Sequence, residues 1–133
     1  MRKKVLIAED QNDIRRMMKV MLELNGYEAI EAVDGLDAVE KTYEFQPDLV
    51  LMDLAMPILG GIDATKAIRQ FDHNPNIPIV AVTAYGDFYK QKALDAGCTD
   101  VIGKPMPFES FKATIDSYLY PATEEPRSNS LSR

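Results

Sequence analysis

Cysteine and long apolar runs are both scarce in this chain, and each scarcity excludes a class of protein. Cys98 is the only cysteine, so no internal disulfide can form and no second thiol is present for a zinc cluster, as is typical of a reducing compartment. No apolar run approaches the ~20 residues that a membrane span requires, and the N-terminal segment turns acidic at Glu9 before a signal-peptide core can form. We therefore expect a cytoplasmic protein without a membrane partner.

Basic charge is also in short supply. The chain has 15 Lys and Arg against 21 Asp and Glu, a formal net charge of -6. This balance leaves no basic face broad enough to neutralise a phosphate backbone, so we expect no nucleic-acid partner. The 133 residues fit one domain, and 46% hydrophobic with 27% charged residues is an ordinary soluble composition. The single histidine, His73, lies in a polar segment, and we expect it on the surface without a chemical role.

Short apolar runs predict the strands of a sheet. Residues 5–8, 49–52 and 79–82 show no alternation of apolar and polar side chains, which is typical of strands covered on both faces. Residues 28–33 and 101–103 are weaker segments that we place at the edges of the sheet. Between and after the strands, apolar residues at helical spacing predict helices over residues 14–22, 36–43, 64–71, 87–96 and 108–119. The apolar spacing is least regular in residues 87–96.

This alternation predicts the fold. Five strands and five helices in turn indicate an α/β protein with a flavodoxin-like, doubly wound, five-stranded parallel sheet of order 2-1-3-4-5. Residues 1–120 would form this domain, and residues 121–133, rich in Pro, Ser and charge, are expected to be a flexible tail. We interpret the stripe of Met17, Met18 and Met21 as core packing of the first helix, because its spacing buries one face.

Polar side chains follow the strands of the predicted sheet at a single edge. The strand ends carry Glu9 and Asp10, then Asp53, then Thr83, and finally Lys104. Taken singly, each has an ordinary explanation as a loop acid, a turn former or a solvated charge. Ligands of such sheets bind beyond the carboxyl ends of the strands, where these residues would meet. Their joint placement therefore predicts a functional site.

The charges of this cluster predict a cation. Glu9, Asp10 and Asp53 sum to -3 and Lys104 contributes +1, which leaves -2 in a partly desolvated cleft. Either a carboxylate takes up a proton or a divalent cation binds, and an all-oxygen site favours a hard ion such as Mg²⁺. A cation-neutralised aspartate is a nucleophile toward phosphorus. Asp53 is thus the predicted phosphoryl acceptor, with Lys104 and the Thr83 hydroxyl placed to stabilise phosphoryl oxygens.

Four motifs in combination resemble a known family. The acidic pair at residues 9–10, LVLMDLAMP around Asp53, AVTA around Thr83 and GKP around Lys104 resemble the receiver domain of two-component response regulators. The resemblance extends over roughly residues 3–120, and the spacing of all four motifs agrees with the family. By this resemblance the chain is expected to be a receiver that takes phosphate from a phosphohistidine on a sensor histidine kinase.

The resemblance also implies a role for each site residue. Asp10, Asp53 and the Ala55 carbonyl would bind Mg²⁺ directly, whereas Glu9 would act mainly through water. Lys104 would pair with the phosphoryl group, and the peptide bond to the proline that follows it would be cis. Many receivers have Tyr or Phe three residues before this lysine, with a rotamer that follows phosphorylation. This chain has Val101 there, which leaves the usual readout unfilled.

Two rival chemistries are disfavoured by single segments. An aspartate-nucleophile phosphatase of similar topology needs an acid/base residue two positions after the nucleophile, where this chain has Ala55. A flavin or nucleotide carrier needs a glycine-rich or hydroxyl-rich loop after the first strand, whereas residues 9–13 are acidic and repel phosphate.

The sequence therefore predicts a single-domain response regulator that is not an enzyme but assists its own Mg²⁺-dependent phosphorylation. The start at Met1 leads us to expect a true N-terminus, and without an effector after Pro121 we expect output by phosphorylation-dependent binding of a downstream protein through residues 87–96. Two alternatives stay open: a phosphorelay shuttle to a histidine phosphotransfer domain, and a receiver cut from a larger protein.

Overall fold

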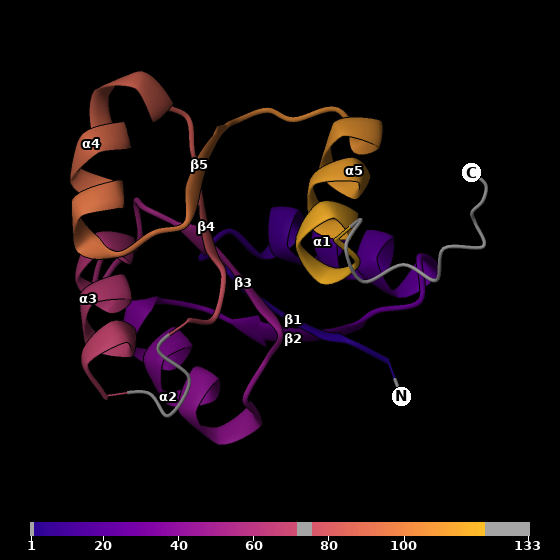
Figure 1. The fold of residues 1–133 in the computed structure, drawn as a ribbon, viewed down its shortest axis with the longest axis horizontal. Coiled ribbons are helices and arrows are strands. Elements are labelled where there is room, and N and C mark those ends of the chain that lie inside the picture. Colours follow the sequence, from indigo (N-terminus) through magenta and orange to yellow (C-terminus); the bar gives the residue numbers. More distant parts are fainter. Residues whose placement is uncertain (1, 72–75, 122–133) are drawn as a thin grey trace.

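Strands and helices alternate along the chain in the computed structural model, which describes residues 2–71 and 76–121 (Figure 1). His73 and the predicted tail beyond Pro121 lie outside the described residues. The strands are β1 (Lys4–Ala8), β2 (Glu28–Ala32), β3 (Leu49–Asp53), β4 (Ile79–Thr83) and β5 (Asp100–Gly103). The helices are α1 (Asn12–Leu24), α2 (Gly35–Phe45), α3 (Gly61–Phe71), α4 (Gly86–Ala96) and α5 (Phe108–Leu119). Among these helices, none has the length and apolar character needed to cross a membrane.

The five strands pair in parallel in the order β2-β1-β3-β4-β5, as predicted. The three uninterrupted apolar runs are the central strands β1, β3 and β4, and the two weaker segments are the edges. Every residue of β3 is buried, whereas β5 has only half-buried and exposed residues. The doubly wound α/β fold predicted from the sequence is therefore confirmed.

Helices cover both faces of the sheet, with α1 and α5 on one side and α2, α3 and α4 on the other (Figure 1). Successive residues of a strand point to opposite faces, so each central strand contributes to both layers of the core. Leu6, Val50 and Ile79 pack toward α2, α3 and α4, whereas Val5, Leu49 and Val80 pack toward α1 and α5. This double coverage explains why the central strands show no alternation.

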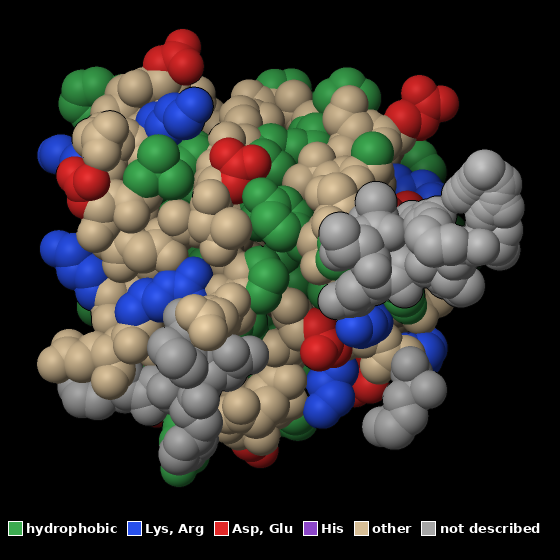
Figure 2. All heavy atoms as spheres, in the orientation of Figure 1, with side chains coloured by type: hydrophobic (Ala, Val, Ile, Leu, Met, Phe, Trp, Pro, Cys, Tyr) green, Lys and Arg blue, Asp and Glu red, His purple; other side chains and the backbone are tan. Residues whose placement is uncertain are grey.

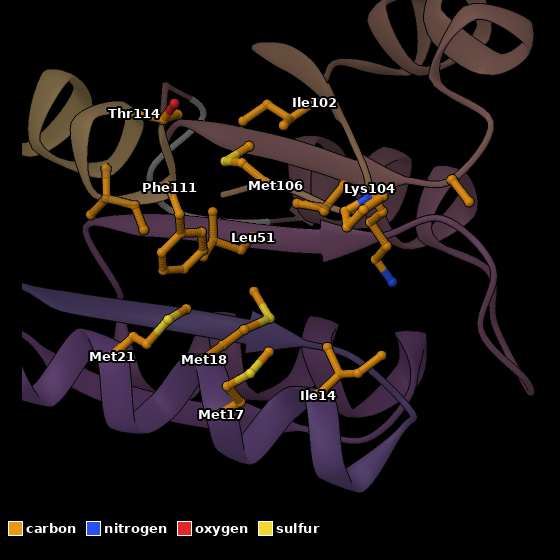
Figure 3. Close-up of a pocket in the computed structure, with 14 residues that line it drawn as sticks. Ile14, Met17, Met18, Met21, Leu51, Ile102, Lys104, Met106, Phe111 and Thr114 are labelled. Atoms are coloured by element: carbon orange, nitrogen blue, oxygen red, sulfur yellow. The ribbon is translucent and has the colours of Figure 1, made fainter. Parts of the chain in front are cut away.

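The methionine-rich stripe of α1 belongs only partly to the core. Met18 is buried, but Met17 is 56% exposed. These two side chains and Met21 face Phe111 and Met106 across a cavity of about 350 Å³ between α1 and α5 (Figure 3). The interpretation as core packing is therefore right for Met18 and wrong for Met17, because α1 and α5 do not close on each other at this level.

The surface mixes charges of both signs. In the view of Figure 2, hydrophobic side chains form a band down the middle of the face, between α4 and α5, and acidic and basic side chains lie on both sides of it. The excess of acidic residues is thus interspersed with lysine and arginine on this face.

Candidate functional site

The carboxyl edge of the sheet brings three carboxylates together. Glu9 and Asp10 follow β1, and Asp53 ends β3; one carboxylate oxygen of each lies within 4.8 Å of the others. The register of β1 and β3 accounts for this proximity. Ala8 is paired with Met52, so the residues that follow them, Glu9 and Asp53, are side by side. Sheet topology alone therefore assembles the acidic cluster that the sequence predicted.

Two of the three carboxylates are buried. Glu9 is 2% exposed and Asp53 is 7% exposed, whereas Asp10 is exposed. Burial of a carboxylate is costly unless it is hydrogen-bonded or paired. The Ala55 amide donates to Asp53 Oδ1 at 3.2 Å, and the Gln11 amide donates to Glu9 Oε2 at 3.2 Å. Backbone amides thus stabilise one oxygen of each buried acid.

Lys104 pairs with the other oxygen of both buried acids. Its Nζ lies 2.7 Å from Glu9 Oε1 and 3.4 Å from Asp53 Oδ2. Burial by itself lowers the pKa of Lys104, but the hydrogen bond to Glu9 and the charges of both acids outweigh it and raise the pKa. The ammonium therefore stays charged. The Lys104–Pro105 peptide bond is cis, as the family resemblance implied.

One lysine does not neutralise the cluster. Burial, followed by the charge of Glu9, raises the pKa of Asp53 to about 6, although Lys104 and the Ala55 amide oppose this shift. The remaining negative charge and the all-oxygen donor set are what a hard divalent cation requires. Among the described residues, Glu9, Asp10 and Asp53 would hold such an ion.

Thr83 lies at the same edge and is 2% exposed. Its hydroxyl oxygen accepts a hydrogen bond from the Tyr85 amide at 3.1 Å, and its carbonyl accepts one from the Lys104 amide at 2.8 Å. The first contact uses the oxygen as an acceptor, so the hydroxyl proton remains available for donation. Thr83 is therefore tied to the loop after β4 and to the lysine through the backbone.

The family model described as the response regulator receiver domain matches residues 5–116. The chain belongs to this family. It is 37% identical over 122 residues to the polar-differentiation response regulator DivK of Brucella anthropi, which covers 90% of this chain and 98% of DivK. DivK of Brucella ovis is 36% identical over the same length and with the same coverage. The family that the four motifs predicted is thus confirmed.

Solved receiver structures have the fold of this receiver. The receiver domain of the Pseudomonas aeruginosa sensor histidine kinase PA1611, which has a magnesium ion coordinated in its active-site cleft, is 28% identical with a TM-score of 0.83 over 90% of this chain and 98% of that one. The chemotaxis protein CheY4 of Vibrio cholerae is 29% identical with a TM-score of 0.83, over 89% of this chain and 99% of CheY4.

Val101, at the usual aromatic position, is half-buried and packs against the core layer of α2, α3 and α4.

Arg15, which the sequence reasoning missed, is 5% exposed and donates from Nη1 to the Glu9 carbonyl at 2.9 Å. A signal was present in the sequence, because Arg15 shares the i, i+3, i+7 stripe with Met18 and Leu22, the other buried residues of α1.

Proposed function

We propose that this receiver accepts a phosphoryl group on Asp53 from the phosphohistidine of a cytoplasmic sensor histidine kinase, and that it signals by phosphorylation-dependent binding of a downstream protein. The observation that carries the proposal is the convergence of three carboxylate oxygens within 4.8 Å, with Lys104 paired to two of these acids. Family membership supports it, since accepting phosphate is general for receivers.

The chemistry proposed for the site is an in-line transfer. A carboxylate oxygen of Asp53 forms a bond to phosphorus as the bond from phosphorus to the donor imidazole breaks, and the imidazole leaves with the electron pair. Lys104 would then pair with one phosphoryl oxygen, and the Thr83 hydroxyl would donate to another. These contacts stabilise negative charge that spreads over the transferring group.

Mg²⁺ is the proposed cofactor. Asp10, Asp53 and the Ala55 carbonyl would hold it, with Glu9 acting through water. A bound Mg²⁺ would offset the charge of the cluster and orient phosphoryl oxygens. The magnesium ion in the cleft of the PA1611 receiver supports this assignment, because that domain has the same fold.

Exposed aromatic side chains at the start of α4 support the proposed output by protein binding. Tyr85 is 64% exposed and Phe88 is 73% exposed, and the Tyr89 ring makes edge contacts with both, at centroid distances of 6.5 and 4.8 Å. Apolar side chains gathered in this way are typical of interaction surfaces. The Tyr85 amide donates to the Thr83 hydroxyl. A new hydrogen-bond partner for that hydroxyl would therefore change the position of Tyr85 and of the aromatic side chains that contact it.

The deciding experiment is phosphorylation by acetyl phosphate in the presence of Mg²⁺, followed by intact mass. The wild-type chain should gain one phosphoryl group, and Asp53→Asn should gain none. Asp48→Asn is a matched control, because Asp48 is an exposed aspartate just before the other end of β3; it should be labelled like the wild type. Equal labelling of Asp53→Asn would rule the proposal out, and removal of Mg²⁺ with a chelator should abolish labelling.

A second candidate is a phosphorelay shuttle that passes the group from Asp53 to a histidine phosphotransfer domain. It is favoured by the likeness to the PA1611 receiver, which is a domain of a sensor histidine kinase. Labelled protein mixed with histidine phosphotransfer domains distinguishes the two functions. Rapid transfer of the label to a histidine would favour the shuttle, whereas retention on Asp53 with tighter binding of a target would favour direct output.

A further inference from the structure

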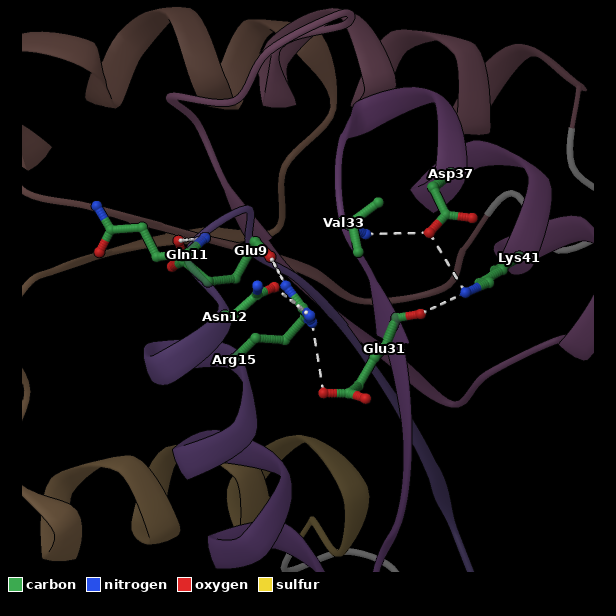
Figure 4. A network of polar contacts seen from close by, with 8 residues as sticks. All are labelled: Glu9, Gln11, Asn12, Arg15, Glu31, Val33, Asp37 and Lys41. Carbon is green, nitrogen blue, oxygen red and sulfur yellow. Dashed lines mark hydrogen bonds and ion pairs between the residues drawn. The ribbon is translucent and has the colours of Figure 1, made fainter.

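A buried arginine, Arg15, contacts the backbone of the acidic cluster. Arg15 is near the start of α1, and its guanidinium donates from Nη1 to the carbonyl oxygen of Glu9 at 2.9 Å (Figure 4). Glu9 is the first residue after β1 and the first residue of the acidic loop that leads to α1. Arg15 therefore fixes the backbone of the chain at the position from which the first two carboxylates of the cluster project.

The other guanidinium nitrogens tie this point to two further elements. Nη2 donates to Asn12 Oδ1 at 2.7 Å at the start of α1, and Nε lies 3.4 Å from Glu31 Oε1 on β2. The β2 strand is itself held nearby, since Lys41 Nζ donates to the Glu31 carbonyl at 2.7 Å (Figure 4). One side chain thus connects the end of β1, the start of α1 and the neighbouring strand.

An apolar residue would complete the buried stripe of α1 at lower cost than this arginine. Met18 and Leu22 occupy the same stripe, and a buried guanidinium must recover its lost hydration from every partner that it contacts. Only a side chain with several fixed donors can reach the Glu9 carbonyl while it also contacts Asn12 and Glu31. The three contacts, rather than the burial of the position, therefore account for an arginine here in place of an apolar residue.

We propose that Arg15 is a positioning residue for the metal site, which holds Glu9 and Asp10 in the geometry that binds Mg²⁺. This inference rests on the proposed function, because it concerns the same cation. Arg15 contacts the cluster through the carbonyl oxygen of Glu9, so its effect on the cation would be exerted through the Glu9 backbone.

Replacement of Arg15 changes Mg²⁺ affinity in opposite directions, depending on whether the residue acts by its charge or by positioning the ligands. A buried positive charge close to the cluster repels a divalent cation, so removal of Arg15 would tighten Mg²⁺ binding if charge were its only contribution. Loss of support for the liganding loop acts in the opposite direction, and loss of such supporting contacts weakens metal binding by about 10-fold or more. Arg15→Met should therefore bind Mg²⁺ about 10-fold more weakly.

The experiment is calorimetric titration of Mg²⁺ into the full chain. Arg15→Lys keeps the charge but cannot reach all three partners, and it should also bind more weakly. Asn12→Ala removes one neutral contact of Arg15 from an exposed residue, without a change in charge, and should weaken binding by less than Arg15→Met does.

Arg69→Met is the matched control, since Arg69 is an arginine of α3 that donates to the Gly97 and Ile77 carbonyls away from the cluster. It should lose thermal stability and keep wild-type Mg²⁺ affinity. Equal or tighter Mg²⁺ binding by Arg15→Met overturns the proposal. If that variant does not fold, wild-type affinity in both Arg15→Lys and Asn12→Ala overturns it. Failure of the wild type to bind Mg²⁺ would instead overturn the metal site of the proposed function.

Discussion

Lys104 Nζ lies 2.7 Å from Glu9 Oε1, which makes Glu9 the nearest acidic partner of this lysine. The distance to Asp53 Oδ2 is longer, at 3.4 Å. The lysine is therefore held mainly by a carboxylate that is not the predicted acceptor. A phosphoryl group on Asp53, as proposed, would compete with Glu9 for the donors of the Lys104 ammonium.

Lys104→Met should separate metal binding from phosphorylation. Lys104 pairs with the carboxylates of Glu9 and Asp53, so its removal leaves a more negative cluster and Mg²⁺ should bind several-fold more tightly. Phosphorylation by acetyl phosphate should nevertheless slow by at least about 10-fold, because the transferring group loses an ammonium partner. Calorimetry with Mg²⁺ and a time course of intact mass measure the two effects.

Lys112→Met is the control for this prediction. Lys112 forms an ion pair with Asp116 on α5, at 2.7 Å, and does not contact the cluster. Its replacement should change neither Mg²⁺ affinity nor the labelling rate. Parallel loss of both properties in Lys104→Met would contradict the assigned role and would indicate that the lysine only supports the fold.

Gly61→Ala should destabilise the protein by roughly 2 kcal/mol. A Cβ at this position would lie 2.3 Å from the Asp53 carbonyl oxygen and 2.8 Å from Leu54 Cα, and neither backbone atom can move without displacing Asp53. Gly60→Ala is a control in the same loop, since its Cβ would meet only the Leu54 carbonyl oxygen, at an ordinary 3.5 Å. Urea denaturation should separate the two variants; equal stability would show that the loop can relax.

Ile58→Gly should stabilise the fold by about 1 kcal/mol. Ile58 has a φ of +69°, a conformation that is strained for a β-branched residue, and it is 78% exposed, so little packing offsets the strain. The turn is closed by a hydrogen bond from the Leu59 amide to the Pro57 carbonyl. Ile58→Val keeps the branched side chain and should leave the melting temperature unchanged. A lower melting temperature for Ile58→Gly would mean that the side chain makes a stabilising contact.

The elements and the acidic cluster were predictable because they depend on local pattern and on sheet topology. Uninterrupted apolar runs identified the central strands, and parallel topology then placed Glu9 and Asp53 at one edge. The burial of Arg15 was missed although its position on the helical stripe indicates it, because a search for apolar periodicity discounts an arginine. Lys104 Nζ lies closer to Glu9, at 2.7 Å, than to Asp53, at 3.4 Å, and no sequence pattern encodes a difference of less than 1 Å.

The raised pKa of Asp53 makes stability depend on pH. Burial and the charge of Glu9 raise this pKa from 3.8 to about 6. Between these values the folded protein holds a proton that the unfolded chain has released, so the free energy of unfolding falls as the pH rises from about 4 to about 6. Asp53→Asn cannot ionise and should escape this loss.

We therefore expect Asp53→Asn to be more stable than the wild type by ~2 kcal/mol at pH 7, and the difference should shrink toward zero near pH 4. Urea denaturation across this range, with a chelator present, measures it. The proposed Mg²⁺ would bind the ionised carboxylate, so saturating Mg²⁺ at pH 7 should stabilise the wild type more than the variant and reduce the gap. A stability difference that is constant with pH would contradict the pKa shift, whereas a pH-dependent difference that Mg²⁺ does not reduce would count only against metal binding at Asp53.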